Sequence, residues 1–386
     1  IHNKKNFSCC SNFQKMVEGK ESVLYALPFC AGTVTGIFLC GHDIFHSPDS
    51  YRIASVSMTA GIGLAVPALL TGGRIGQRAK VILAAAAAFF CGIFCWSNHE
   101  ISDIAAGNSG IQDMIERATA PAAAWLKSGI DALPLDDYGS NALIKALVTG
   151  DQSDVPSDVK AAFRDSGASH ILALSGMHLA IIYLILSKAL AVIGQSRKAD
   201  VTRYTVILVS TLFYSIMTGS SPSIIRAFLF ILLRETALLT GRKARPVNIL
   251  CFALTVQCAL DPGVITSASF QLSYLAMCGI YFLYPSLRDL YPAPVPVLKK
   301  IWNSAAMSIS CQAFTGPLAW VLFDSAPIYF IITNLIAIPL TSALMPVALG
   351  AVFLNRAGIC PEFLIRGINW CCEFTVWCLE VICTLP

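Results

Sequence analysis

The chain has 386 residues, of which 55% are hydrophobic and only 13% are charged, and its formal net charge is +4. Soluble domains carry about 25% charged residues, so too little charge is present here to cover the surface of a soluble globule. This composition excludes a cytosolic enzyme, a disordered protein and a nucleic-acid-binding module that relies on a charged surface. It predicts an all-α, polytopic helical membrane protein.

Eleven apolar stretches are long enough, or nearly so, to cross the hydrocarbon core of a bilayer. The stretch 247–260 is short, and 327–354 carries Pro339 and Pro346, which predict a broken or re-entrant element. The first stretch follows a basic region but has no A-x-A-like cleavage site, so we interpret it as an uncleaved span. The expected spans are approximately 24–40, 53–70, 81–96, 171–193, 204–219, 223–240, 247–260, 265–284, 302–323, 327–354 and 364–385.

Lysine and arginine gather in every second loop between these spans. The positive-inside rule places such loops in the cytoplasm. We therefore expect a multi-pass protein of the bacterial cytoplasmic (inner) membrane with a cytoplasmic N-terminus and an extracytoplasmic C-terminus. The basic segments are 1–23, 71–80, 194–203, 241–246, 285–301 and the loop that contains Arg356.

The long hydrophilic segment 97–170 contains eleven acidic and five basic residues, which agrees with an extracytoplasmic location. Its helix-like patches at 112–127 and 140–149 predict two or three interfacial helices. The chain thus divides into an N-terminal three-span membrane unit, an acidic extracytoplasmic connector and an eight-span channel domain, at 1–96, 97–170 and 171–386 respectively. In the first span, Gly32 and Gly36 form a small-xxx-small pair that predicts close helix packing.

The fifteen cysteines lie mostly inside apolar runs, and no CxxC occurs. This pattern favours buried structural thiols over a disulfide framework or a zinc site. No Walker motif, GxGxxG, HExxH or Cys/His metal cluster is present in the sequence. We therefore expect no metal, no cofactor and no ATP-coupling site in this chain.

Polar residues inside apolar spans indicate a cavity, a pathway or an interhelical hydrogen bond. In SHILALSGMHLAII, which starts at Ser169, His170 begins the span, and Ser175 and His178 lie three residues apart on neighbouring helix faces. Gly176 between them permits a kink or a close backbone approach. Serine beside histidine also suits a nucleophile and its base, although no acid in the span orients the histidine. A pathway lining, interhelical hydrogen bonding and catalysis all stay open.

A second group of polar residues occurs in TGSSPSIIRAFLF, which starts at Thr218. Ser221 can cap a helix that has Pro222 at its first position. Arg226 follows one turn later, so the helix dipole and the guanidinium both attract an anion such as phosphate. The alternative is a structural pair between Arg226 and Asp261 or a backbone carbonyl.

Two further groups follow. Asp261–Pro262 lies at a membrane boundary and is expected to start a turn or helix. Gln271 and Ser273 then enter an apolar run, where they suit either a polar conduit or helix packing. Asn334, between Pro327 and Pro339 in PIYFIITNLIAIPL, is typical of broken helices that line transporter sites; the alternative is a kinked span with one satisfied asparagine.

These four groups, in this order, resemble the competence domain of the ComEC family of bacterial DNA-uptake channels over about residues 140–386. The first string, SGASHILALSGMHL, carries the most specific part of the resemblance, and the later strings add to it in series. The matching positions are Gly167, His170, Leu172–Ala173, Ser175–Gly176, His178, Ser221, Ser223, Arg226–Ala227, Asp261–Pro262, Phe270–Ser273, Asn334 and Pro339.

The resemblance implies an inner-membrane channel that translocates single-stranded DNA into the cytoplasm during natural transformation. Residues expected to line the pathway or contact DNA are His170, Ser175, His178, Ser223, Arg226, Gln271, Ser273 and Asn334. Residues expected to form the structural motif are Gly167, Gly176, Pro222, Asp261, Pro262 and Pro339.

Family members commonly carry an OB-like domain and a metallo-β-lactamase-like domain, a candidate nuclease, and neither is found in this sequence. We therefore expect no enzymatic activity in this chain. Its expected partners are single-stranded DNA, membrane lipid, and a separate DNA receptor, nuclease and cytoplasmic helicase or ATPase; a homo-oligomer is also considered. Two other functions stay open: a secondary transporter of a small anionic solute that uses Arg226 and Asn334, and an intramembrane hydrolase that uses Ser175 and His178.

Overall fold

The computed structural model of the chain describes residues 21–41, 47–70, 77–105, 110–135, 138–193, 196–242, 245–291, 295–323 and 329–384. Within these residues every regular element is a helix, and no strand is present. The all-α prediction is therefore confirmed for the described part of the chain. Two compact units form, each from two stretches: residues 1–110 with 241–271, and residues 111–240 with 272–386.

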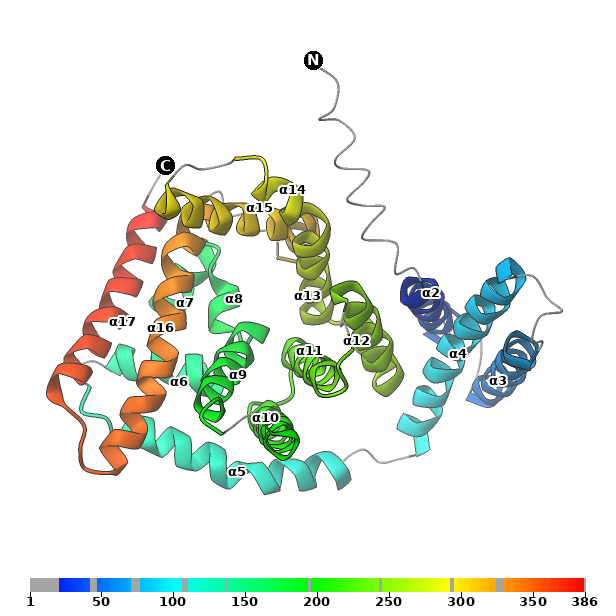
Figure 1. Cartoon of the computed structure of the whole chain (residues 1–386), viewed down its shortest axis with the longest axis horizontal. Coiled ribbons are helices and arrows are strands. Elements are labelled where there is room, and N and C mark those ends of the chain that lie inside the picture. Colours follow the sequence, from blue (N-terminus) through cyan, green and yellow to red (C-terminus); the bar gives the residue numbers. More distant parts are fainter. Residues whose placement is uncertain are drawn as a thin grey trace, which may run out of the picture. The chain divides into compact units, whose positions relative to one another are not determined.

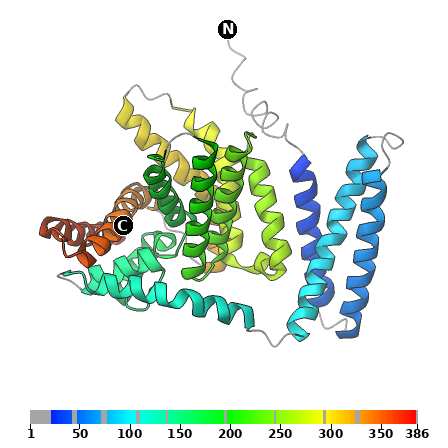
Figure 2. The ribbon, with the colours of Figure 1, turned by 60° about the horizontal axis from the view of Figure 1, so that its bottom comes forward.

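The first unit combines three long helices with a helix from later in the chain. Helix α4 lies beside both α2 and α3, and α12 packs on α2 (Figures 1 and 2). The Ser22 hydroxyl donates a hydrogen bond to the Asn248 side-chain oxygen at 2.7 Å, which joins α2 to α12. The boundaries of the two compact units therefore differ from the boundaries of the three segments predicted from the sequence. The elements are α2 (Glu21–Gly41), α3 (Ser47–Leu70), α4 (Gln77–Ala105), α12 (Pro246–Leu260) and the 3-10 helix η1 (Pro262–Thr266).

Small residues allow α2 and α4 to meet backbone to backbone. A Cβ atom on Gly32 would lie 1.9 Å from the Phe89 carbonyl oxygen, and one on Gly92 would lie 2.1 Å from the Phe29 carbonyl oxygen. A Cβ atom on Gly36 would lie 2.8 Å from a side chain of α4. These distances are far below van der Waals contact, so the close packing predicted for Gly32 and Gly36 is confirmed.

The second unit contains the connector helices and most of the C-terminal half of the chain. The boundary between the units passes through α13. The elements that lie wholly or mostly in the second unit are α5 (Gly110–Asp131), α6 (Tyr138–Thr149), α7 (Ser157–Asp165), α8 (Ser169–Leu172), α9 (Gly176–Leu190), α10 (Arg197–Met217), α11 (Pro222–Leu239), α13 (Ala268–Cys278), the π-helix η2 (Gly279–Leu283), α14 (Tyr284–Arg288), α15 (Pro296–Phe323), α16 (Phe330–Arg356) and α17 (Glu362–Cys383).

Helix α6 lies in the core of this unit. Every residue from Ala142 to Thr149 is buried. The helix packs against α8, α16 and α17 (Figure 1), and the Tyr214 hydroxyl of α10 donates to the Val148 carbonyl oxygen at 2.8 Å. A helix that is apolar on most sides is buried rather than interfacial. The prediction that the connector helices are interfacial is therefore wrong for α6.

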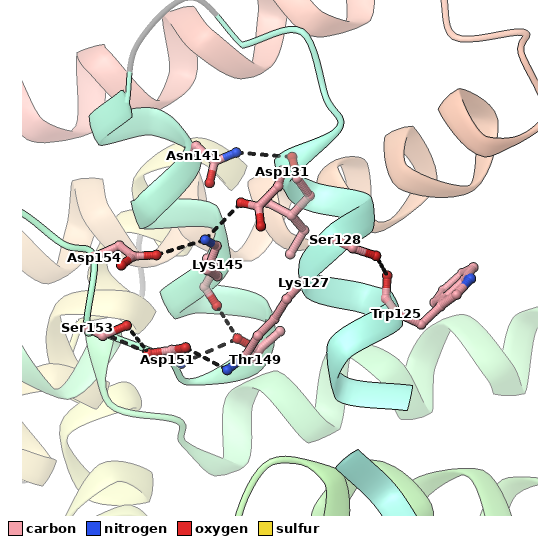
Figure 3. A network of polar contacts seen from close by, with 11 residues as sticks. Trp125, Lys127, Ser128, Asp131, Asn141, Lys145, Thr149, Asp151, Ser153 and Asp154 are labelled. Carbon is pink, nitrogen blue, oxygen red and sulfur yellow. Dashed lines mark hydrogen bonds and ion pairs between the residues drawn. The ribbon is translucent and has the colours of Figure 1, made fainter. Parts of the chain in front are cut away.

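A network of ion pairs holds α6 to its neighbours (Figure 3). The ammonium group of Lys145 lies 2.8 Å from a carboxylate oxygen of Asp131 and 2.8 Å from one of Asp154. Burial alone lowers the pKa of Lys145, but its hydrogen bonds to the two carboxylates outweigh burial and raise the pKa above its ordinary value. Lys127 pairs with Asp151 at 2.6 Å nearby. The acidic character of the connector thus serves partly to neutralise lysines at this contact.

We expect Lys145→Met to lower the free energy of unfolding by about 1–3 kcal/mol, because a buried donor is replaced and two carboxylates lose their partner. Arg164→Met is the matched control, since the Arg164–Asp165 pair is exposed, with 70% and 55% of the two side chains accessible. Exposed pairs contribute about 0–1 kcal/mol. Unfolding of the purified protein by SDS titration measures both variants. Equal losses in the two variants would contradict the structural role of the network.

Four helical segments in the described residues are long and apolar enough to cross a membrane. The predicted count of about eleven spans is not confirmed, because the apolar helices α9 and α12 have only 15 residues each and α17 carries four charged residues. The four segments are Ser22–Leu39, Val81–Asn98, Pro296–Phe323 and Phe330–Arg356, and shorter apolar segments are Ile53–Ala65, Gly176–Leu190 and Pro246–Leu260.

Helix α16 is unbroken from Phe330 to Arg356, with both Pro339 and Pro346 inside it. The prediction of a broken or re-entrant element at this point is therefore wrong. Each proline removes one backbone donor, but apolar helices tolerate this loss when packing and hydroxyl side chains satisfy the turn. The Thr341 hydroxyl donates to the Ala337 carbonyl oxygen at 2.7 Å in the same region.

The end of α16 lies against the connector. The Arg356 guanidinium donates to the Ser128 hydroxyl at 2.7 Å and lies 5.3 Å from the centre of the Trp125 ring. The Asn355 side-chain amide donates to the Ala132 carbonyl oxygen at 2.9 Å. The prediction that placed the Arg356 loop and the connector on opposite sides of the membrane disagrees with these contacts. Charge counting missed them because the number of basic residues in a loop does not reveal which segment that loop contacts.

Candidate functional site

The junction between α8 and α9 places Ser175 and His178 together. Ser175 is the N-cap of α9, and its hydroxyl accepts a hydrogen bond from the Met177 backbone N–H at 3.3 Å. Nδ1 of His178 accepts from the Ser175 backbone N–H at 3.1 Å and lies 3.2 Å from the Ser175 hydroxyl oxygen. This is a capping box in which histidine replaces the usual Glu or Gln.

The capping box bears on the catalytic alternative. An Nδ1 atom that already accepts a backbone N–H is poorly placed to take the proton of the Ser175 hydroxyl. His178 is 1% exposed, so its imidazole ring is also closed to an incoming substrate in this conformation. The arrangement therefore favours a bracing role for both residues.

The start of α11 follows the sequence prediction in its backbone but not in its side chains. Ser221 is the N-cap residue and Pro222 occupies the first turn, yet the Ser221 side chain makes no capping hydrogen bond. Within the described residues, the Ser221 hydroxyl and Nη1 of Arg226 are buried and have no hydrogen-bond partner. A buried donor left unpaired costs about 1–3 kcal/mol, and more when it is charged. The unpaired Nη1 donor of Arg226 is therefore suited to bind an anion transiently.

Helices α9 and α11 pack against each other (Figure 1), and Arg226 lies at their contact. A Cβ atom on Gly176 would lie 3.2 Å from the Ala227 Cβ atom, 3.6 Å from Nη2 of Arg226 and 3.8 Å from the Ser223 carbonyl oxygen. Gly176 is therefore the residue that lets the first turn of α9 lie beside the guanidinium. This contact brings the first two sequence groups together.

Two further helices complete the site. The Ser223 hydroxyl donates to the Ser273 hydroxyl of α13 at 3.0 Å, and the Arg226 guanidinium carbon lies 5.7 Å from the centre of the Tyr274 ring. The Ser342 hydroxyl of α16 lies 3.4 Å from the Met177 sulfur. Arg226 of α11 thus lies beside the first turn of α9 and the Tyr274 ring of α13, and α16 contacts this turn of α9 at Met177.

The other predicted residues have separate surroundings. His170 lies in α8 and is exposed. The Gln271 amide donates to the Ile265 carbonyl oxygen at 2.8 Å and so holds the turn that precedes it. Asp261 ends α12 and Pro262 begins η1, which confirms the predicted turn. Asn334 lies near the start of α16, and its side-chain oxygen is buried without a hydrogen-bond partner among the described residues.

Gly167 and Pro222 have the backbone roles that their types suggest, whereas Pro339 lies inside the continuous helix α16. Gly167 has a φ angle of 84°, a left-handed conformation that favours glycine, in the turn after α7. Sequence reasoning missed Tyr274 as the aromatic partner of Arg226 and missed Ser342 altogether. The sequence offered one indication of this contact. An arginine inside an apolar span needs a partner, and an aromatic ring is one of the few uncharged groups that attract a guanidinium.

The fold and site together describe a helical membrane protein with an incompletely paired cation inside a helix bundle. The model of the Competence protein family matches residues 147–386, which is more than half of the chain. The chain therefore belongs to that family, and the resemblance to the ComEC family is confirmed.

Three curated relatives match parts of the chain. The uncharacterized protein YcaI of Escherichia coli K12 is 26% identical over 249 residues, which are 61% of this chain and 31% of the relative. ComE operon protein 3 of Bacillus subtilis 168 is 25% identical over 224 residues, which are 58% of this chain and 27% of the relative. Competence protein ComA of Neisseria gonorrhoeae is 24% identical over 263 residues, which are 64% of this chain and 36% of the relative. The chain thus spans about a third of the length of these relatives, and no solved structure matches it.

Proposed function

We propose that the chain forms a channel, or part of one, that translocates single-stranded DNA across the bacterial inner membrane into the cytoplasm during natural transformation. The observation that carries the proposal is the Arg226 guanidinium, whose Nη1 atom is buried and has no hydrogen-bond partner within the described residues. Membership of the Competence protein family supports the same substrate.

The chemistry around Arg226 suits a phosphodiester backbone. The first turn of α11 adds the positive end of its helix dipole to the charge of the guanidinium. The Ser223 hydroxyl donates to the Ser273 hydroxyl at 3.0 Å, which leaves the Ser273 hydroxyl as a neutral donor for an anion. A translocating strand needs contacts that are weak and multiple, so that each phosphate also leaves.

A secondary transporter of a small anionic solute is the second candidate, because Arg226 suits any small anion as well. Uptake of labelled oligonucleotides into proteoliposomes that contain the full chain separates the two functions. A DNA channel takes up strands at rates that depend on strand length and releases intact strands inside. A small-anion transporter takes up mononucleotides and excludes longer strands.

We further propose that the chain carries out no covalent chemistry and that a DNA receptor, a nuclease and a helicase or ATPase are separate partners. The proposed orientation has the N-terminus in the cytoplasm and the connector and C-terminus outside. Contact of the Cys383 thiol with the Ala162 carbonyl oxygen at 3.5 Å agrees with a common side for the connector and the end of α17. Labelling of single cysteines at positions 75 and 120, in a variant without the native cysteines, tests the orientation, because Ala120 is an exposed residue of the connector helix α5. Labelling of position 120 from the cytoplasm contradicts the proposed orientation.

We expect Ser175→Ala to keep most of the DNA uptake, because it removes only an N-cap worth about 1 kcal/mol. His178→Gln should also keep uptake, since glutamine supplies the same acceptor at this position of a capping box. His178→Leu removes the acceptor and should lower both stability and uptake. Uptake and thermal unfolding measure all three variants. Complete loss of activity in well-folded Ser175→Ala and His178→Gln would favour the hydrolase instead.

A further inference from the structure

A small cavity lies in the second unit between α6, α7 and α17, away from Arg226. Its volume is about 210 Å³, smaller than the cavities of about 300–1,000 Å³ that hold drug-sized ligands. A space of this size suits a single side chain. The walls include Ser140 and Leu143 of α6, Val159 of α7, and Glu373, Trp377 and Glu380 of α17.

The α17 wall of this cavity is negatively charged and aromatic. Glu373 and Glu380 are two helical turns apart on one face, with Trp377 between them, and all three are exposed. Neither glutamate forms an ion pair within the part of the chain that the structure describes. Carboxylates beside an indole ring are the groups that bind a lysine ammonium or an arginine guanidinium.

The aromatic character continues along α17 beyond the cavity. The rings of Trp370 and Phe374 are stacked with centroids 5.1 Å apart, and those of Phe374 and Trp377 with centroids 5.9 Å apart. Trp370 is 61% exposed and Trp377 is 57% exposed. Exposed aromatic side chains of this kind are enriched at protein–protein interfaces and often dominate their binding energy.

The charges decide which occupant covers this surface, which we call the α17 face (Glu373, Glu380, Trp370, Phe374 and Trp377). A lipid tail covers aromatic rings well, but two ionised glutamates in hydrocarbon cost about 2.5–3.5 kcal/mol each near the bilayer centre. A small free cation uses the carboxylates but leaves the Trp370–Phe374 stack exposed. A polypeptide that carries both a basic and an apolar side chain satisfies both parts.

We propose that the α17 face is a docking surface for a basic segment of a partner protein, which inserts one lysine or arginine side chain into the cavity. The cation lies between Glu373 and Glu380 and against the Trp377 ring. An adjacent apolar side chain of the same segment packs on Trp370 and Phe374. The partner is thus defined by chemistry: alternating basic and apolar residues on one edge.

The test uses the purified full chain in detergent and a fluorescent, amidated peptide of alternating arginine and leucine. A matched peptide has citrulline in place of arginine, which keeps the shape and removes the charge. We expect saturable binding of the arginine peptide, at least about tenfold weaker binding of the citrulline peptide, and the same loss in the double variant Glu373→Gln, Glu380→Gln. Trp377→Leu should weaken binding several-fold.

Glu362→Gln is the matched control, because Glu362 lies on the same helix, pairs with Arg366 at 2.6 Å and does not line the cavity. This variant should bind the arginine peptide like the unmodified chain. Thermal unfolding confirms that the glutamine variants remain folded. Equal binding of the two peptides, absence of binding, or unchanged binding by the double variant would overturn the proposal. So would a change of oligomeric state in the double variant without peptide binding, which assigns the face to a second copy of the chain.

Discussion

Arg226→Ala is expected to abolish DNA uptake while leaving the fold intact. The guanidinium forms no ion pair within the described residues, its Nη1 atom has no hydrogen-bond partner there, and its aromatic partner Tyr274 is uncharged. Removal of the guanidinium therefore leaves no opposite charge unpaired. Each charge-assisted hydrogen bond to a phosphate is worth about 1.5–3 kcal/mol, or about 10- to 100-fold in affinity. Loss of Arg226, the main proposed anion contact, therefore removes most of the affinity of the site for DNA phosphates.

Arg226→Lys should weaken uptake without abolishing it, because lysine keeps the charge but cannot bind phosphate in a bidentate way. Arg234→Lys is the matched control on the same helix: its guanidinium lies 5.5 Å from the centre of the Tyr183 ring, away from Gly176 and Tyr274. We expect near-normal uptake from this control. Restored DNA uptake in the double variant Arg226→Ala, Asp261→Ala would contradict the phosphate-contact role, since that result points to a structural pair.

Gly176→Val is expected to have the second largest effect. A Cβ atom at this position already lies 3.2 Å from the Ala227 Cβ atom and 3.6 Å from Nη2 of Arg226, so the two further carbons of valine displace α9 from α11. Overpacking typically costs about 1–3 kcal/mol, and here it also moves the guanidinium. We therefore expect strongly reduced uptake together with a lower free energy of unfolding.

A compensating change tests this explanation. Ala227→Gly removes the nearest methyl group, so Gly176→Val combined with Ala227→Gly should recover part of both stability and uptake. Gly350→Val is the control, because a Cβ atom on Gly350 of α16 meets no other atom within 4 Å. Denaturation in SDS and oligonucleotide uptake report the two effects. If the double variant behaves like Gly176→Val alone, contact with Ala227 is not the cause.

Sequence patterns located the site where local rules were sufficient. Pro222 and Ser221 mark the start of α11, and the position of Arg226 one turn later follows directly from helix geometry. Close helix packing at Gly32 was predictable in the same way, because small residues spaced four apart in an apolar span are typical of helix–helix contacts. The order of the four polar groups also located the family match, which covers residues 147–386.

Tertiary contacts explain what the sequence did not reveal. Periodicity alone does not distinguish an interfacial helix from a buried one, so the core position of α6 required the surrounding helices. Pro339 predicted a break in α16, but proline removes only one hydrogen bond and packing kept the helix continuous. Arg356 was assigned to the cytoplasm by its charge, whereas its partners Ser128 and Trp125 come from a segment more than two hundred residues earlier.

The most direct measurement compares strands with charged and uncharged backbones. The full chain is reconstituted in a planar bilayer, and translocation of a single strand is measured for phosphodiester DNA and for a methylphosphonate strand of equal length and sequence. The account predicts that the phosphodiester strand passes, that the uncharged strand passes at least about tenfold more slowly, and that Arg226→Lys narrows this difference. Equal passage of the two strands, or a difference that Arg226→Lys leaves unchanged, would contradict it.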